Sequence, residues 1–73
     1  MYAEVAIMNF AIEFEMEMDG RWIAEIEQLP GVMAYGASRE EAQARVEALA
    51  LRVLADRIEE RELTVEQISF RAA

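Results

Sequence analysis

Two alternating segments joined by a tight turn constrain the fold more than any other feature of this sequence. From Phe10 to Glu17, and again from Trp22 to Glu27, apolar residues alternate with other, mostly acidic, residues, and Asp19-Gly20 lies between the segments. Alternation with a period of two predicts half-buried strands, and Asp-Gly between two such strands predicts a hairpin. The chain must therefore build a sheet with one apolar face that needs a cover.

The length of the hairpin loop follows from matching the apolar faces of the two strands. A two-residue loop would place Glu17 opposite Trp22, which puts the two apolar sets on opposite faces. A three-residue loop of residues 18–20, with Gly20 in a left-handed conformation, instead pairs Glu17 with Arg21 and Met16 with Trp22. We predict the three-residue loop.

This register collects the acidic side chains on the second face of the sheet. They are Glu13, Glu15, Glu17, Glu25 and Glu27, and we take this face as the candidate partner-binding surface. Carboxylates bind hard cations, and paired acids on a sheet can support metal-dependent phosphoryl transfer. Acids at every second position are nevertheless typical of a solvated strand face, and we favour that interpretation, with no metal site.

The rest of the chain predicts one more strand, a helix and a final strand. Leu29-Pro30-Gly31 ends the second strand, and residues 32–37 form a short third one. Ser38 is the predicted N-cap of a helix that runs from about Arg39 to Arg61, with Glu41 at the capping-box position. Residues 68–71 are a short fourth strand.

The order of these elements determines a topology. Two hairpins send the first and third strands in the same direction, and the helix returns the chain so that the fourth strand runs parallel to the first. We predict a single α+β domain over residues 1–73, with a three-stranded antiparallel meander, one helix on one face, and a β-β-β-α-β order that gives the sheet 3-2-1-4. Residues 1–8 are an extended lead-in that could pair with a sheet edge or with another subunit.

The helix has a wider apolar arc than one sheet requires. Its sheet-facing stripe is Ala42, Val46, Leu49, Ala50 and Val53. Leu51, Leu54 and Ile58 lie further round the helix, so we predict that these three residues form an oligomer interface, most simply in a homodimer. Trp22 and Tyr35 are predicted at the core or its rim, with an interface anchor as the alternative for both.

Composition narrows the possible functions. The 73 residues include 15 acids and seven basic residues, all of them arginine, for a net charge of -8, so direct binding to nucleic acid is not expected. The chain has no His and no Cys, and we expect no enzyme activity and no cofactor. No basic leader or uninterrupted apolar run predicts export or a membrane span, which leaves a cytoplasmic location as the expectation.

The motifs together resemble a known family. Asp19-Gly20 with Trp22-Ile23-Ala24-Glu25, then Leu29-Pro30-Gly31, then Gly36-x-Ser38-x-Glu40-Glu41-Ala42, resemble the HicB-like antitoxins of prokaryotic toxin–antitoxin pairs. The resemblance implies a partial ribonuclease H-like fold and the neutralisation of a small basic mRNA-cleaving toxin by direct binding. Fuller members carry a carboxy-terminal DNA-binding domain, for which a chain ending at Ala73 has no room. The alternative function is a self-associating structural or small-ligand-binding domain without a toxin.

Overall fold

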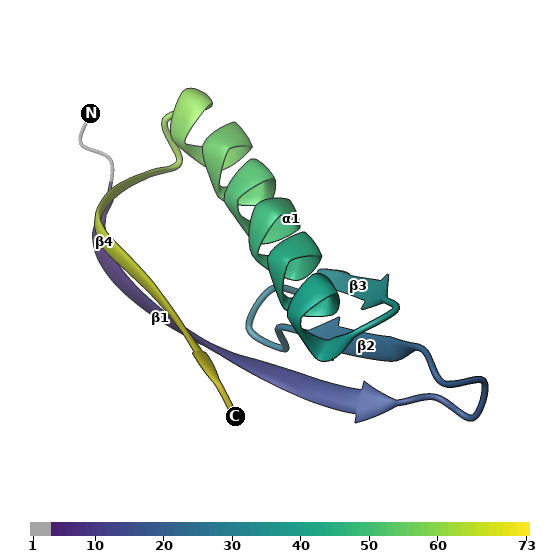
Figure 1. Cartoon of the computed structure of the whole chain (residues 1–73). Helices are drawn as coiled ribbons and strands as arrows, with labels where there is room; N and C mark the ends of the chain where they lie inside the picture. The colour runs from purple at the N-terminus through teal and green to yellow at the C-terminus, as the bar shows by residue number, and fades with distance from the viewer. Residues whose placement is uncertain (1–3) are drawn as a thin grey trace.

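The computed structural model describes residues 4–73. The elements are β1 (Glu4–Met16), β2 (Trp22–Glu25), β3 (Met33–Gly36), α1 (Arg39–Glu59) and β4 (Leu63–Ala72). The strands form one sheet in the order β3-β2-β1-β4, and α1 covers one face of it (Figure 1). β1 is antiparallel to β2 and parallel to β4, and β2 is antiparallel to β3. The predicted α+β class and strand order are therefore confirmed.

The first hairpin has the predicted three-residue loop. Met16 lies opposite Trp22, and the Glu17 N–H donates to the Arg21 carbonyl at 2.7 Å. Gly20 has a φ of 90°, in the left-handed region that favours glycine. The Arg21 N–H donates to the Asp19 carboxylate at 3.1 Å, and this bond, together with the Arg21 side chain, lowers the Asp19 pKa below its ordinary value of 3.8. The turn is thus closed by its own polar groups.

β1 is longer than the sequence predicted. It begins at Glu4 rather than Phe10, because residues 4–8 of the lead-in belong to the strand and pair in parallel with β4 of the same chain. Residues 1–3 of the lead-in lie outside the described residues. Val5 to Met8 is apolar at every position, so it has no alternation from which a strand could be recognised.

β4 is also longer than predicted, because a bulge hides its alternation. Ala6 pairs with Val65 but Ile7 pairs with Gln67, which leaves Glu66 as the extra residue in β4. A bulge of this kind shifts the side-chain phase by one position. Val65 on one side of Glu66 and Ile68 on the other are therefore both half-buried, although their spacing breaks the period of two.

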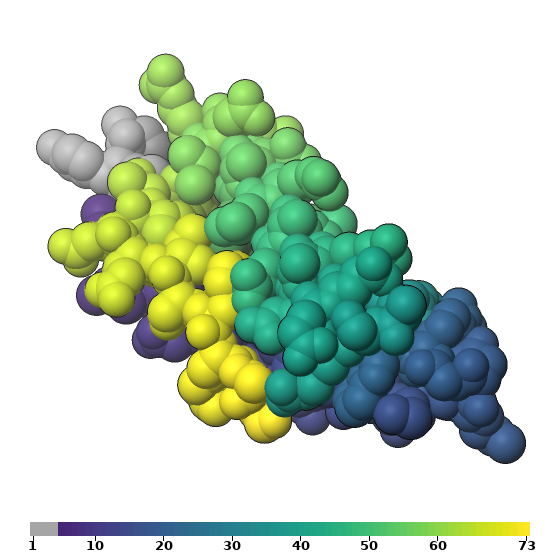
Figure 2. Space-filling view, in the orientation of Figure 1, coloured from purple at the N-terminus to yellow at the C-terminus, as the bar shows by residue number. Residues whose placement is uncertain are grey.

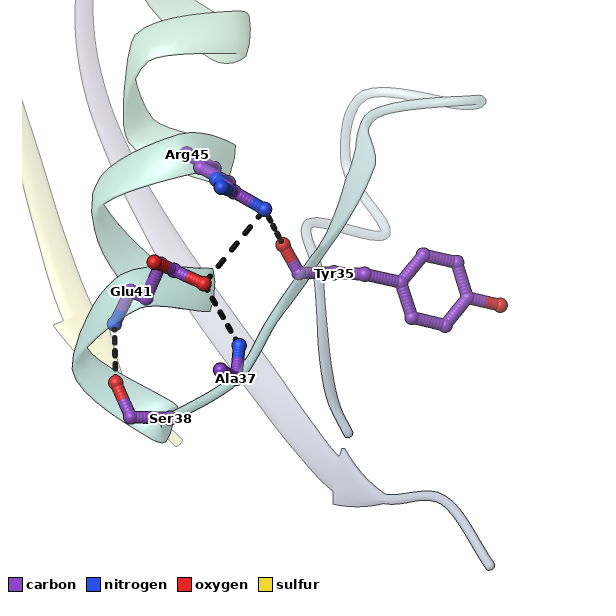
Figure 3. Close-up of polar contacts among 5 residues, drawn as sticks. All are labelled: Tyr35, Ala37, Ser38, Glu41 and Arg45. Carbon is purple, nitrogen blue, oxygen red and sulfur yellow. Dashed lines mark hydrogen bonds and ion pairs between the residues drawn. The ribbon is translucent and has the colours of Figure 1, made fainter. Parts of the chain in front are cut away.

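Hydrogen bonds connect the start of α1 to β3. The Ser38 hydroxyl accepts from the Glu41 N–H at 3.1 Å, and the Glu41 carboxylate accepts from the Ala37 N–H at 2.7 Å (Figure 3). Arg45 donates from Nη1 to the Tyr35 carbonyl at 2.9 Å. The bond to Ser38 satisfies a helix-end donor that would otherwise be unpaired, and it confirms the predicted cap.

The end of α1 is set by a left-handed residue that is not glycine. The helix ends at Glu59, two residues before the predicted end, and Arg61 follows with a φ of 62°. The Arg61 N–H donates to the Ile58 carbonyl at 3.0 Å and the Glu62 N–H donates to the Arg57 carbonyl at 2.9 Å, the pattern of a Schellman cap. Without a glycine, the sequence gives little sign of this stop.

The core lies between α1 and the sheet, and it corrects one predicted site. Buried residues of β1, β2, the turn after β2 and α1 form a single cluster: Phe10, Ile12, Ala24, Ile26, Leu29, Val32, Ala42, Val46, Ala50 and Leu54. Leu54, predicted at an exposed oligomer interface, is only 1% exposed. The buried helix positions recur every four residues, so the stripe drifts round α1 by about 40° per step as the helix crosses the sheet. Leu51 and Ile58 remain exposed, by 46% and 42%.

The molecule is long and narrow, with principal extents of 49 × 19 × 16 Å. In the space-filling view of Figure 2, β4 lies along α1, and the hairpin of β1 and β2 projects at one end of the molecule. Since α1 covers only one face, the opposite face of the sheet, which we call the open face, is not covered by any described residue.

Candidate functional site

Two rows of side chains cross the open face at the end where β1, β2 and β3 pair. In the first row Glu13 lies opposite Glu25, which lies opposite Met33. In the second row Glu15 lies opposite Ile23, which lies opposite Tyr35. These positions alternate with residues of the core, so their side chains project away from α1.

These rows surround a hollow in the surface. We call it the acidic hollow, and its volume is about 360 Å³. The residues that line it are Glu13, Phe14, Glu15, Ile23, Glu25 and Met33. Three carboxylates and two apolar side chains, Ile23 and Met33, therefore face the same space. The sequence predicted the three carboxylates as site residues but not Ile23 and Met33, although the alternation of β2 places Ile23 beside Glu25.

Like charges crowd around Glu13. The pKa of its carboxyl is raised above the ordinary value of 4.5, first by a hydrogen bond with the Glu27 carboxyl and by the charge of Glu27, then by desolvation and the charge of Glu25. A raised pKa means that folding favours the protonated carboxyl over the charged one. The acidic hollow is therefore a place where negative charge accumulates at a cost that a cationic partner would relieve.

We expect Glu13→Gln to raise the free energy of unfolding at pH 7. Because the folded pKa is raised, the stability that Glu13 contributes is present below the unfolded pKa and is lost as pH rises through the folded pKa. The gain from Gln should therefore shrink as the pH falls below 4.5. Urea unfolding at pH 7 and at a pH below 4.5 measures this gain in stability, with the exposed Glu62→Gln as a control for net charge. An equal gain in both variants would contradict the prediction.

Not all of the predicted acidic face lies in the hollow. Glu13, Glu15 and Glu25 line it, and Glu27 lies in the turn after β2, close enough to affect Glu13. Glu17 lies between β1 and the hairpin turn and does not line the hollow. The Glu17 N–H nevertheless donates to the Arg21 carbonyl, so Glu17 continues the pairing of the hairpin beyond the hollow.

Two aromatic residues were predicted at the core or its rim, and only one is there. Trp22 is half-buried and packs against the core. Tyr35 is 39% exposed on the open face, with the Arg21 guanidinium 4.5 Å from its ring centroid. Its ring points away from α1 (Figure 3). The prediction for Tyr35 was wrong, because its neighbours on β3, Ala34 and Gly36, are the residues that face the helix.

The other half of the open face carries two exposed apolar side chains beside polar ones. Val5 and Ile7 project from β1 beside β4 and are 66% and 59% exposed. Nearby, the Ser69 hydroxyl donates to the Asn9 side-chain carbonyl at 2.6 Å across the same two strands. Val5 and Ile7 were not predicted as surface residues, because the lead-in was not assigned to a strand.

Among residues 4–73, no three acidic side chains are arranged as a set of metal ligands. In that same part of the chain, no helix has the length and hydropathy needed to cross a bilayer.

Comparisons with models of protein families, with curated proteins and with solved structures give no match for this chain. The resemblance to HicB-like antitoxins therefore depends on the motifs in the sequence.

Proposed function

We propose that this chain is a non-enzymatic protein-binding module of the HicB antitoxin type. It would neutralise a small basic mRNA-cleaving toxin by binding it directly on the open face. The observation that carries the proposal is the acidic hollow, where Glu13, Glu15 and Glu25 lie beside Ile23 and Met33. The family motifs also support the proposal, because most of their residues form the turns and the helix cap, while Ile23 and Glu25 of the first motif line the hollow.

The composition of the acidic hollow suits a basic protein better than other ligands. Apolar side chains in a binding patch supply area that a protein partner buries, and neighbouring carboxylates increase the rate of encounter with a positively charged partner. The net charge of -8 acts in the same direction over a longer range, and it repels the phosphates of DNA and RNA. The proposal therefore includes no direct binding to an operator.

We also propose that the chain self-associates, most simply as a homodimer. A domain of 73 residues buries only about 60% of the surface of its unfolded chain. Large apolar side chains remain exposed to water on both layers: Leu51 and Ile58 on α1, and Val5 and Ile7 on β1. Association would remove part of that exposure.

The genes beside this one provide the first test. The proposal expects an adjacent open reading frame for a small basic protein with a catalytic His, whose purified product binds this chain. A gene that stands alone, together with a chain that self-associates, would favour the alternative of a structural or small-ligand-binding domain.

A charge variant tests the surface. With the adjacent product as the partner, Glu13→Gln/Glu15→Gln/Glu25→Gln should slow association by about tenfold or more at low salt and weaken the dependence of the rate on salt. Stopped-flow or surface plasmon resonance measures both quantities. The matched control is Glu40→Gln/Glu59→Gln/Glu62→Gln, which makes the same change of charge at exposed positions away from the hollow. Equal rates for the two variants would place the partner elsewhere.

A further inference from the structure

β4 has one free edge. It is the outermost strand of the sheet and pairs only with β1 among the described elements. The Ala73 N–H donates to the Ile12 carbonyl at 2.8 Å. Every second residue before Ala73, namely Arg71 and Ser69, therefore also directs its backbone N–H and C=O groups to β1. Because successive residues alternate, Ile68 and Phe70 direct their N–H and C=O groups to the free edge. Such an edge can accept another strand.

Apolar surface borders this edge on the helix side. Arg45 contacts the Tyr35 carbonyl, which marks the flank of α1 that faces β3. At about 100° per residue, Leu51 and Ile58 lie about 120° and 140° round the helix from Arg45, on the flank towards β4. Both are exposed, and Phe70 of β4 is only half-buried. Figure 2 shows β4 and α1 side by side on this surface.

The distribution of charge indicates which partner chain can pair with the free edge of β4. The chain carries a net charge of -8, but β4 contains only Glu66 and Arg71 as charged residues, one of each sign. The pairing with β1 ends at Ile12 and Ala72, so Glu13 and Glu15 lie beyond the end of β4. A second copy of this chain can therefore approach at β4 with little repulsion, whereas a basic partner would be drawn to the acidic hollow instead.

We propose that two copies of this chain pair antiparallel through β4 and form one continuous eight-stranded sheet. Ser69 lies on the two-fold axis, and Ile68 pairs with Phe70 of the second copy through the outward backbone groups. Gln67 then lies opposite Arg71. This inference rests on the proposed self-association and not on the proposed toxin.

The bulge in β4 and the side-chain faces single out this register. A shift of one pair in one direction would set Phe70 opposite Glu66, the bulged residue, and a shift in the other direction would set Ile68 opposite Ala72. The chosen register instead joins the half-buried Ile68 and Phe70 of both copies. A two-fold axis perpendicular to the sheet places both helices on the same face, so that their Leu51 and Ile58 flanks face each other. It also keeps the two acidic hollows at opposite ends.

Cysteine cross-linking tests the register, since the chain has no cysteine of its own. Residues that face each other in a non-hydrogen-bonded antiparallel pair have Cα atoms about 4.5 Å apart, within the range of a disulfide. Ser69→Cys should therefore give a covalent dimer under mild oxidation, seen on a non-reducing gel. Gln67→Cys is the matched control on the same strand and face, where the register separates the two copies by about four residues along the strand, or about 13 Å. It should remain monomeric on the gel.

Sedimentation equilibrium of the unmodified chain separates this inference from the proposed self-association. A monomer overturns both. A dimer in which Ser69→Cys cross-links no faster than Gln67→Cys overturns the β4 pairing and leaves self-association standing. The expected result is a dimer, rapid cross-linking of Ser69→Cys alone, and loss of that cross-linking in urea.

Discussion

Replacing Gly36 with alanine is expected to lower the free energy of unfolding by about 3 kcal/mol, a large part of what a domain of this size has. Gly36 is buried at the end of β3, where α1 begins directly above it. A Cβ built there would overlap the Ala42 backbone N–H group and come within 2.9 Å of the Ala42 Cα. The obstacle is helix backbone, which cannot rotate away, so β3 and α1 would have to separate.

Urea unfolding measures the effect, and Gly20→Ala is the matched control. Gly20 has a positive φ, but nothing lies within 4 Å of a Cβ at that position, so its replacement should cost only the conformational strain, about 1 kcal/mol. If Gly36→Ala cost no more than Gly20→Ala, the close packing of α1 on β3 would be wrong.

Truncation of Leu54 to alanine is expected to cost about 2–5 kcal/mol, the range for a large side chain in a packed core. Leu54 is 1% exposed, whereas Leu51, three residues earlier on α1, is 46% exposed. Leu51→Ala is therefore the control, and it should cost about 0.5 kcal/mol or less in the monomer. Comparable losses for the two variants at low protein concentration would contradict the burial of Leu54.

The same pair of variants gives information about self-association. If a second copy covers Leu51, the cost of Leu51→Ala should grow as protein concentration rises, because the folded state is then linked to the dimer. The cost of Leu54→Ala should vary less, since Leu54 is already buried within one copy. Unfolding midpoints at low and high concentration would show the difference.

The resemblance to HicB-like antitoxins and the acidic hollow contribute different information. The motif residues Gly20, Ser38 and Glu41 act in a turn and at a helix cap, and so they explain a fold rather than a binding surface. The hollow combines two motif residues, Ile23 and Glu25, with Glu13, Phe14, Glu15 and Met33 from outside the motifs. A test of toxin binding and a test of the fold therefore require changes at different residues.

The sequence by itself determined the features that depend on neighbouring residues. The three-residue hairpin loop, the left-handed Gly20, the Ser38 cap and the order β3-β2-β1-β4 all follow from local turn chemistry and from the need to keep apolar faces together. The acids of the hollow were also predicted, because alternation in β1 and β2 decides which side chains share a face.

Only the tertiary structure decided where those local elements meet. The strand at residues 4–8 is stabilised by pairing with β4, some 60 residues later, and the bulge at Glu66 adjusts β4 to that partner. Leu54 is buried because α1 crosses the sheet obliquely, so the face it buries turns gradually from β3 towards β4 (Figure 1). A helical stripe drawn from the sequence assumes a fixed face, whereas the crossing angle depends on how twisted strands and side chains pack together.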